Sequence, residues 1–252
     1  MWADENRRSK LEITSMGLHF LAMACMLLDH LWATVIPGNE QWMTCVGRLA
    51  FPIFAFMTVE GFFYTKNLKK YMGRMLLFAI LSEIPFNLML TGSVIYPFHQ
   101  NVLWSFLIGL CLMAWNEKMK ETGKLWLQGA TAVGTLLLGT LLGMFTFVDY
   151  GSAGVQMVLL FYFFRGRNWW NYLAQLAGMI YINKEIGGLI YGFELFGKSI
   201  SFPQQCFAVF ALIPIWLYRG KQGPHNKVLQ MIYYAFYPVH LLALWIIMRF
   251  VL

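Results

Sequence analysis

The amino-acid sequence predicts an all-α membrane protein, a polytopic bundle of about nine transmembrane helices in a single domain over residues 1–252. Hydrophobic residues make up 59% of the chain and charged residues only 12%, whereas soluble proteins carry about 25% charged residues. Several apolar runs exceed the roughly 18 residues that a helix needs to cross the hydrocarbon core. Because so few polar side chains could not cover a soluble fold, we expect the helices to face lipid.

Each predicted span is an apolar run that ends near charged residues, glycine or proline. In chain order the predicted spans are 14–36, 41–64, 71–91, 101–116, 124–145, 149–164, 169–186, 204–218 and 228–251. The glycine-rich stretch 184–203 is predicted to be an outer loop or a re-entrant segment. Because some of the runs are short or only weakly apolar, the prediction admits seven to ten spans.

The distribution of basic residues predicts the orientation, since cytoplasmic loops are enriched in lysine and arginine. If the N-terminus is cytoplasmic, most of the 19 basic residues fall in cytoplasmic segments. These residues are Arg7, Arg8, Lys10, Lys66, Lys69, Lys70, Arg74, Lys118, Lys120, Lys124, Arg165, Arg167, Arg219, Lys221 and Lys227. The net charge of +7 therefore reflects topology, and no nucleic-acid partner is predicted. The four cysteines have neither metal-ligand nor redox spacing, so no metal site is predicted.

Ionisable side chains within the spans are the candidate functional residues, because a charge in mid-bilayer costs at least about 2.5 kcal/mol. At a rise of about 1.5 Å per residue, most of them fall in the outer half of the membrane, and only Glu60 falls clearly toward the cytoplasm. The candidate catalytic residues are Asp29, His30, Arg48, Glu83, Asn101, Asp149, Tyr237 and His240. A structural alternative stays open, in which Arg48 only neutralises Asp29 or Glu83 and fixes the helix register.

Among these residues His30 is suited to act as a general base. A neutral imidazole beside a carboxylate accepts a proton near pH 7, and Asp29 precedes His30 in the chain. Adjacent helical positions differ by about 100°, so Asp29 need not contact His30 and can face Arg48 instead.

Six motifs that follow one another along the chain resemble the TraX family. They are MLLDH at 26–30, GRLAFPIFAFMTVEGF at 47–62, YTKNLKKYMGRMLLFAILSEIPFN at 64–87, NVLWSF at 101–106, DYGSAGV at 149–155 and YYAFYPVH at 233–240. The family is named for the membrane acetylase that modifies the N-terminus of F pilin. The resemblance implies an acetyl-CoA-dependent transferase that acts on an amine, as a multi-pass protein of the bacterial cytoplasmic membrane.

A more distant similarity to the acyltransferase-3 and heparan-α-glucosaminide acetyltransferase families implies an essential histidine on an early span, which here corresponds to His30. In acyltransferase-3 proteins an S-G-F segment follows that histidine. This chain has Glu60, Gly61 and Phe62 at a similar place. The glutamate departs from the serine, so no role of that serine is carried over to Glu60.

Acetyl transfer to an amine requires removal of a proton, which we assign to His30. Before the attack Asp29, Glu83 or Asp149 could hold the ammonium form of the acceptor, and Arg48, Asn101 or Tyr237 could stabilise the oxyanion. A basic cluster on the cytoplasmic side is predicted to bind the phosphates of coenzyme A, although it could equally be a topology signal. The members of this cluster are Lys66, Lys69, Lys70 and Arg74.

Two other functions stay open at this point. One is an O-acyltransferase that modifies a glycan hydroxyl by the same chemistry. The other is a proton-coupled transporter that uses Asp29, Glu83 and Asp149 as a relay, although the sequence lacks the internal repeats of many transporters. The expected partners are a coenzyme A thioester, membrane lipid and an amine acceptor, which could be a peptide N-terminus, an amino sugar or a small amine. Formation of a homo-oligomer is also left open.

Overall fold

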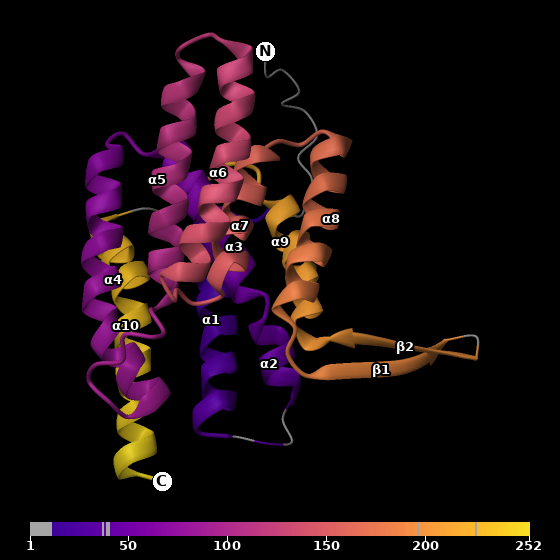
Figure 1. Ribbon diagram of the computed structural model, residues 1–252. Coiled ribbons are helices and arrows are strands. Elements are labelled where there is room, and N and C mark those ends of the chain that lie inside the picture. Colours follow the sequence, from indigo (N-terminus) through magenta and orange to yellow (C-terminus); the bar gives the residue numbers. More distant parts are fainter. Residues whose placement is uncertain (1–11, 37, 39–40, 196, 225) are drawn as a thin grey trace.

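The computed structural model describes residues 12–36, 38, 41–195, 197–224 and 226–252. Helices run along the long axis of a bundle, and one β-hairpin projects from its side (Figure 1). The elements are α1 (Ser15–Thr34), α2 (Gln41–Gly47), α3 (Ala50–Tyr64), α4 (Leu68–Thr91), α5 (Val102–Lys120), α6 (Leu125–Phe145), α7 (Gly151–Phe163), α8 (Trp169–Ile186), β1 (Ile190–Leu195), β2 (Lys198–Pro203), the 3₁₀ helix η1 (Gln204–Ala211), α9 (Leu212–Leu217) and α10 (Lys227–Phe250).

Helices occupy every predicted apolar run, and their ends lie within a few residues of the predicted ones. Within the described part of the chain, five segments are long and apolar enough to cross a membrane: α1, α2 together with α3, α4, α6 and α10. The segments Gly151–Phe163 and Gln204–Leu217 are apolar but shorter. The predicted helical fold is thereby confirmed, and the total of about nine spans stays a prediction.

Polar residues at the N-caps explain where several helices begin, because their side chains accept hydrogen bonds from backbone N–H groups of the first turn. Thr14 caps α1 through the N–H of Gly17 at 3.2 Å. Asn67 caps α4 through the N–H of Lys70 at 2.9 Å. The cap of α5 is Asn101, one of the candidate catalytic residues.

The span predicted over 41–64 is one apolar segment with the predicted bounds, Gln41–Tyr64, but its helix is interrupted between α2 and α3. Proline lacks an N–H group, and its ring clashes with the carbonyl four residues earlier. For Pro52 that carbonyl belongs to Arg48, and the interruption falls at Arg48 and Leu49. The break therefore places the Arg48 side chain at a helix junction inside the bundle.

The stretch predicted as an outer loop or re-entrant segment forms the antiparallel β1–β2 hairpin, with Ile190 opposite Pro203 and Leu195 opposite Lys198. Gly197, with φ of 73°, lies in the turn. The hairpin lies toward the same end of the bundle as the C-terminus, away from the α5–α6 turn (Figure 1). Gly197 marks a turn between two strands, which the apolar-run analysis did not anticipate.

Three loops meet at the other end of the bundle, which we call the basic end: 65–67, 164–168 and 218–224. Arg165 Nε donates to Glu60 Oε1 at 2.8 Å, and Arg167 Nη2 donates to the carbonyl of Tyr218 at 2.8 Å. This end carries Lys66, Arg165 and Arg167, so it corresponds to the predicted cytoplasmic side. Arg7, Arg8 and Lys10, which support the same orientation, lie outside the described residues.

Candidate active site

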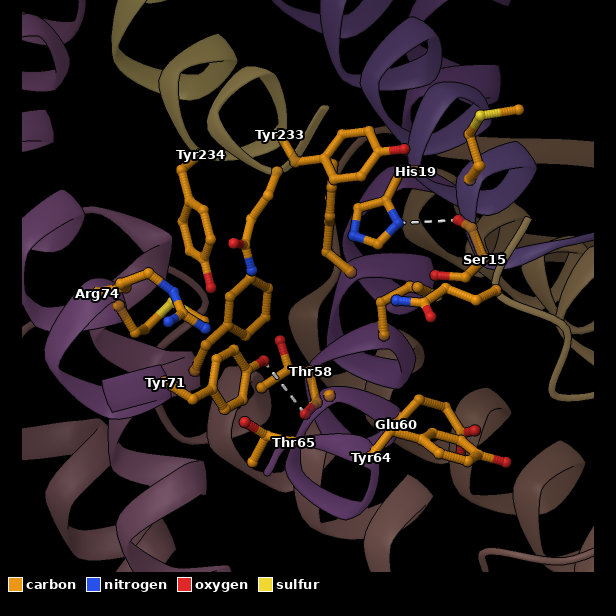
Figure 2. A pocket seen from close by; sticks show the side chains of 18 of the residues that line it. Ser15, His19, Thr58, Glu60, Tyr64, Thr65, Tyr71, Arg74, Tyr233 and Tyr234 are labelled. Atoms are coloured by element: carbon orange, nitrogen blue, oxygen red, sulfur yellow. Dashed lines mark hydrogen bonds between the residues drawn. The ribbon is translucent and has the colours of Figure 1, made fainter. Parts of the chain in front are cut away.

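A cavity of about 630 Å³ opens at the basic end, between α1, α3, α4, α5 and α10. Figure 2 shows side chains of α1, α3, α4 and α10 around it. Lys66, Thr65 and Gln222 line its mouth, and Ser15 marks the start of α1 there. The deepest lining residue of α1 is Met26, about 16 Å further along the helix. The cavity therefore reaches roughly halfway through a bilayer of about 30 Å.

The lining changes from polar to apolar with depth. Glu60, Arg74 and Gln230 belong to the part near the mouth, whereas Phe54 and Leu103 lie at the inner end. Further apolar residues of the inner part are Met26, Met57, Met75, Val102 and Phe106. Tyr237 supplies a hydroxyl at this inner end.

Aromatic rings frame the polar part of the cavity (Figure 2). The guanidinium carbon of Arg74 lies 6.0 Å from the ring centroid of Tyr71 and 5.9 Å from that of Tyr234. Across the cavity the His19 ring stacks on Tyr233 at 4.1 Å. Arg74 Nε and the Tyr233 hydroxyl are buried and have no hydrogen-bond partner in the described part of the chain. Because buried polar atoms are usually paired, these two atoms indicate a ligand site.

His30 and His240 form a hydrogen-bonded pair, although they are 210 positions apart in the sequence. His30 Nδ1 lies 2.8 Å from His240 Nε2, and His240 Nδ1 lies 2.7 Å from the carbonyl oxygen of Phe236. A carbonyl oxygen can only accept a hydrogen bond, so His240 Nδ1 carries a proton. In the neutral ring, His240 Nε2 then has no proton and accepts a hydrogen bond from His30 Nδ1–H. In the neutral pair the lone pair of His30 is consequently on Nε2, available to receive a proton.

The histidine pair lies just beyond the inner end of the cavity. His30 follows Met26 by four residues and His240 follows Tyr237 by three, and both Met26 and Tyr237 line the cavity. One helical turn, about 5 Å along each axis, therefore separates the lining from the pair. The candidate base thus lies just beyond the closed end of a cavity that opens at the basic end.

Asp29 belongs to a separate ion pair with Arg48. Thr44 Oγ1 donates to Asp29 Oδ1 at 2.7 Å, and Arg48 Nη1 donates to Gln205 Oε1 at 3.2 Å. A Cβ atom on Gly47 would lie 2.4 Å from Asp29 Cβ, so only glycine permits this close approach of α2 to α1. Of the two carboxylates proposed as partners of Arg48, the structure brings Asp29 to it.

Glu83 and Asn101 join α4 to the start of α5. Glu83 Oε1 accepts from the backbone N–H of Asn101 at 3.1 Å, from Trp104 Nε1 at 2.8 Å and from Asn101 Nδ2. Asn101 Nδ2 also donates to the carbonyl of Ala79 at 2.8 Å. Both side-chain N–H groups of Asn101 therefore have acceptors. Of the three candidate oxyanion donors, Tyr237 is the one that lines the cavity.

The basic cluster is divided by the structure. Lys66 and Arg74 line the cavity, whereas Lys69 and Lys70 are exposed and lie outside its described lining. Glu60 lines the cavity too but is paired with Arg165. A Cβ atom on Gly61 would lie 2.7 Å from the Tyr71 hydroxyl, so the glycine next to Glu60 makes room for a ring of the cavity wall.

Several polar residues of this region were not identified from the sequence. Gln205 and Thr44 complete the surroundings of the Asp29–Arg48 pair, but they are uncharged and gave no signal of their own. The tyrosines of the cavity wall did carry a signal. Gln230, Tyr233, Tyr234 and Tyr237 have the i, i+3, i+4, i+7 spacing of one helix face, and all four line the cavity.

Asp149 contacts the loop between α4 and α5, through His99. His99 Nε2 is 3.2 Å from Asp149 Oδ1, which also accepts from the backbone N–H of Tyr150 at 3.1 Å. The hydrogen bond with Asp149 raises the pKa of His99, although partial burial opposes the shift. The pair thus fixes the loop 92–101 against the turn before α7.

The contact between His99 and Asp149 predicts that the stability of the protein depends on pH. A histidine whose pKa is raised by folding contributes stability that is complete below the unfolded pKa of about 6.5 and is lost as the pH rises through the folded pKa. The melting temperature of wild type should therefore exceed that of His99→Asn most at about pH 6 and least at about pH 8.5. With side chains 37% and 27% exposed, the effect should stay below about 1 kcal/mol. A difference that grows with pH would contradict this assignment.

The fold and the site together define a class, a helical membrane protein with a deep cavity that ends one helical turn before a partly buried histidine pair. The chain belongs to the TraX family: the family model described as "TraX protein" matches residues 15–248. This confirms the resemblance carried by the six motifs. A probable fimbrial assembly protein FimC, serogroup H1, from Dichelobacter nodosus is 26% identical over an alignment of 252 positions, which covers 93% of this chain and 95% of the relative. No solved structure matches the chain.

Proposed function

We propose that this protein is an acetyltransferase of the bacterial cytoplasmic membrane, with about nine spans and a cytoplasmic N-terminus, that moves an acetyl group from acetyl-CoA to an amine. The observation that carries the proposal is the position of the cavity. It opens at the basic end and stops one helical turn before the His30–His240 pair. Such a cavity brings a cytoplasmic donor to within one helical turn of a base in the outer half of the membrane, without the donor crossing the membrane.

The dimensions and chemistry of the cavity fit a coenzyme A thioester. From Ser15 to His30 the α1 axis runs about 22 Å, close to the roughly 20 Å reach of a pantetheine arm. Lys66 at the mouth and Arg74 in the wall supply positive charge for the phosphates. The unpaired Arg74 Nε and Tyr233 hydroxyl are available as further donors to the same ligand.

The proposed reaction assigns a role to each group at the inner end. His30 Nε2 removes a proton from the acceptor amine as its nitrogen bonds to the acyl carbon. The Tyr237 hydroxyl donates to the acyl oxygen while negative charge develops there. The carbon–sulfur bond then breaks, and the proton held by His30 passes to the leaving thiolate. His240 holds His30 in the tautomer that this sequence requires.

The acceptor is proposed to be an amine that reaches the histidine pair from the side opposite the donor. The name of the Dichelobacter nodosus relative, a probable fimbrial assembly protein, supports an acceptor among the components of fimbriae. An amine of a pilin-like subunit, in particular its N-terminus, is therefore the first substrate to test, ahead of amino sugars and small amines.

Binding of acetyl-CoA tests the donor site directly. A ligand at a hundred times its Kd stabilises the native state by about 2.7 kcal/mol, so millimolar acetyl-CoA should raise the melting temperature of the detergent-purified protein. Arg74→Ala should weaken this binding at least tenfold, because a hydrogen bond to a charged group contributes about 1.5–3 kcal/mol. Lys124→Ala is the matched control: it removes one positive charge from the exposed α5–α6 turn, outside the described lining.

The same experiment separates the enzyme from a transporter. If acetyl-CoA left the melting temperature of wild type unchanged, and the protein in liposomes carried a solute across the bilayer, the proposed acetyltransferase would be wrong. Equal affinity in Arg74→Ala and Lys124→Ala would instead remove Arg74 from the donor site and leave the enzyme class intact.

A further inference from the structure

The inner end of the cavity differs in chemistry from the rest. Its residues include Met26 from α1, Phe54 from α3, Leu103 and Phe106 from α5, and Tyr237 from α10. All of them are large, and Met26, Phe106 and Tyr237 are 9%, 4% and 6% exposed. Apart from the single hydroxyl of Tyr237, this end presents only apolar atoms of large side chains to a ligand.

A second buried cluster closes the cavity at this end. Met26 and Tyr237 pack there with Cys25, Phe86 and Leu241, and Leu103 packs against the same group. Leu241 is 0% exposed. The lining therefore continues into closely packed side chains, and a ligand longer than the cavity would have to displace them.

We propose that this apolar end selects the length of the donor acyl chain, with Met26 and Leu103 as the specificity-determining residues for acetyl over longer groups. The inference rests on the proposed function. If Arg74 holds the donor near the mouth and His30 fixes the site of reaction, the acyl chain is the one part of the donor whose length can vary. Each added methylene must then fit against Met26, Leu103 or their packed neighbours.

The expected discrimination follows from known pockets. One methylene that an apolar site cannot accommodate changes kcat/KM by roughly 10- to 200-fold. Butyryl-CoA carries two methylenes more than acetyl-CoA, so wild type should prefer acetyl-CoA by a factor of at least about 100. Shortening a side chain at the inner end should admit the longer chain and reduce that preference.

The test measures kcat/KM of the full-length protein in detergent or liposomes with acetyl-CoA and butyryl-CoA, using one amine acceptor. Met26→Ala is expected to lower the acetyl-to-butyryl ratio at least tenfold, and Leu103→Ala should act in the same direction. Met26→Phe, which adds volume, is expected to lower kcat/KM for acetyl-CoA itself. Met16→Ala is the matched control, because Met16 lines the cavity near its mouth, and it should leave the ratio at the wild-type value.

The outcomes separate the two proposals. If wild type transferred no acyl group from either donor, the proposed acetyltransferase would fail. If wild type used butyryl-CoA as well as acetyl-CoA, or if Met26→Ala and Leu103→Ala both kept the wild-type ratio, the selection of chain length would be overturned and the enzyme class would stand. Should Met26→Ala fail to fold, the acetyl-to-butyryl ratio of Leu103→Ala decides the outcome. Leu103 is only partly buried, so its replacement should disturb folding less.

Discussion

Replacement of His30 by glutamine is expected to lower the rate of acetyl transfer by about 10²- to 10⁴-fold, the usual contribution of a general base. Glutamine is similar in size and can still donate to His240, but it cannot accept the proton of the amine. Acetylation of a peptide N-terminus by the purified protein, followed by mass spectrometry, gives the rate. The control is binding: acetyl-CoA should stabilise His30→Gln as much as wild type, because the donor site near Arg74 is unchanged. Equal rates of product formation would exclude His30 as the base.

Two substitutions of His240 test whether its hydrogen bond to His30 matters for activity. His240→Gln keeps an oxygen that can accept from His30 Nδ1, whereas His240→Leu removes the acceptor. We therefore expect His240→Leu to lose activity on the order of 10²-fold and His240→Gln to retain most of it. Equal loss in both variants would show that packing around His240, rather than its hydrogen bond to His30, determines the activity.

The second large effect concerns stability. Arg48→Met is expected to destabilise the protein by about 3 kcal/mol, because Asp29 is then left in the bundle without its cation. The side chains of Arg48 and Asp29 are 20% and 13% exposed. Asp29→Asn combined with Arg48→Met should recover much of the loss, since the orphaned charge is removed as well. Thermal unfolding in detergent provides the measurement.

A surface ion pair supplies the control for Arg48. Lys120 and Glu117 are 2.8 Å apart but 49% and 36% exposed, so Lys120→Met should cost no more than about 1 kcal/mol. If Arg48→Met were no more destabilising than Lys120→Met, water would be reaching Asp29. In that case the Asp29 carboxylate would be able to contact the acceptor amine and would not be held in the ion pair with Arg48.

The sequence predicted the helices well because transmembrane helices leave a strong, local signal. Their apolar runs and polar caps, such as Asn67 and Asn101, depend only on neighbouring residues. The break of the second span was readable in principle from Pro52, whose ring opposes the carbonyl of Arg48. The hairpin at 190–203 was missed, because glycine-rich polar segments outside the spans fit several structures.

The candidate site was predictable only in part. Ionisable residues within apolar runs were found from their cost of insertion, and these include His30, His240 and the Asp29–Arg48 pair. Which of them meet could not be read from one sequence, because partners such as His30 and His240 come from the first and last helices. The cavity was not foreseen, since tyrosine and methionine, the most frequent residue types of its wall, look like ordinary packing residues until the helices are assembled.

One helix takes part in both halves of the site. The tyrosines of α10 form a wall of the cavity, and one turn further the same helix holds His240 against His30. The wall that would contact the donor and the histidine that orients the base are therefore parts of one rigid element. A substitution that shifts α10 along its axis would change the shape of the cavity and the His30–His240 distance together.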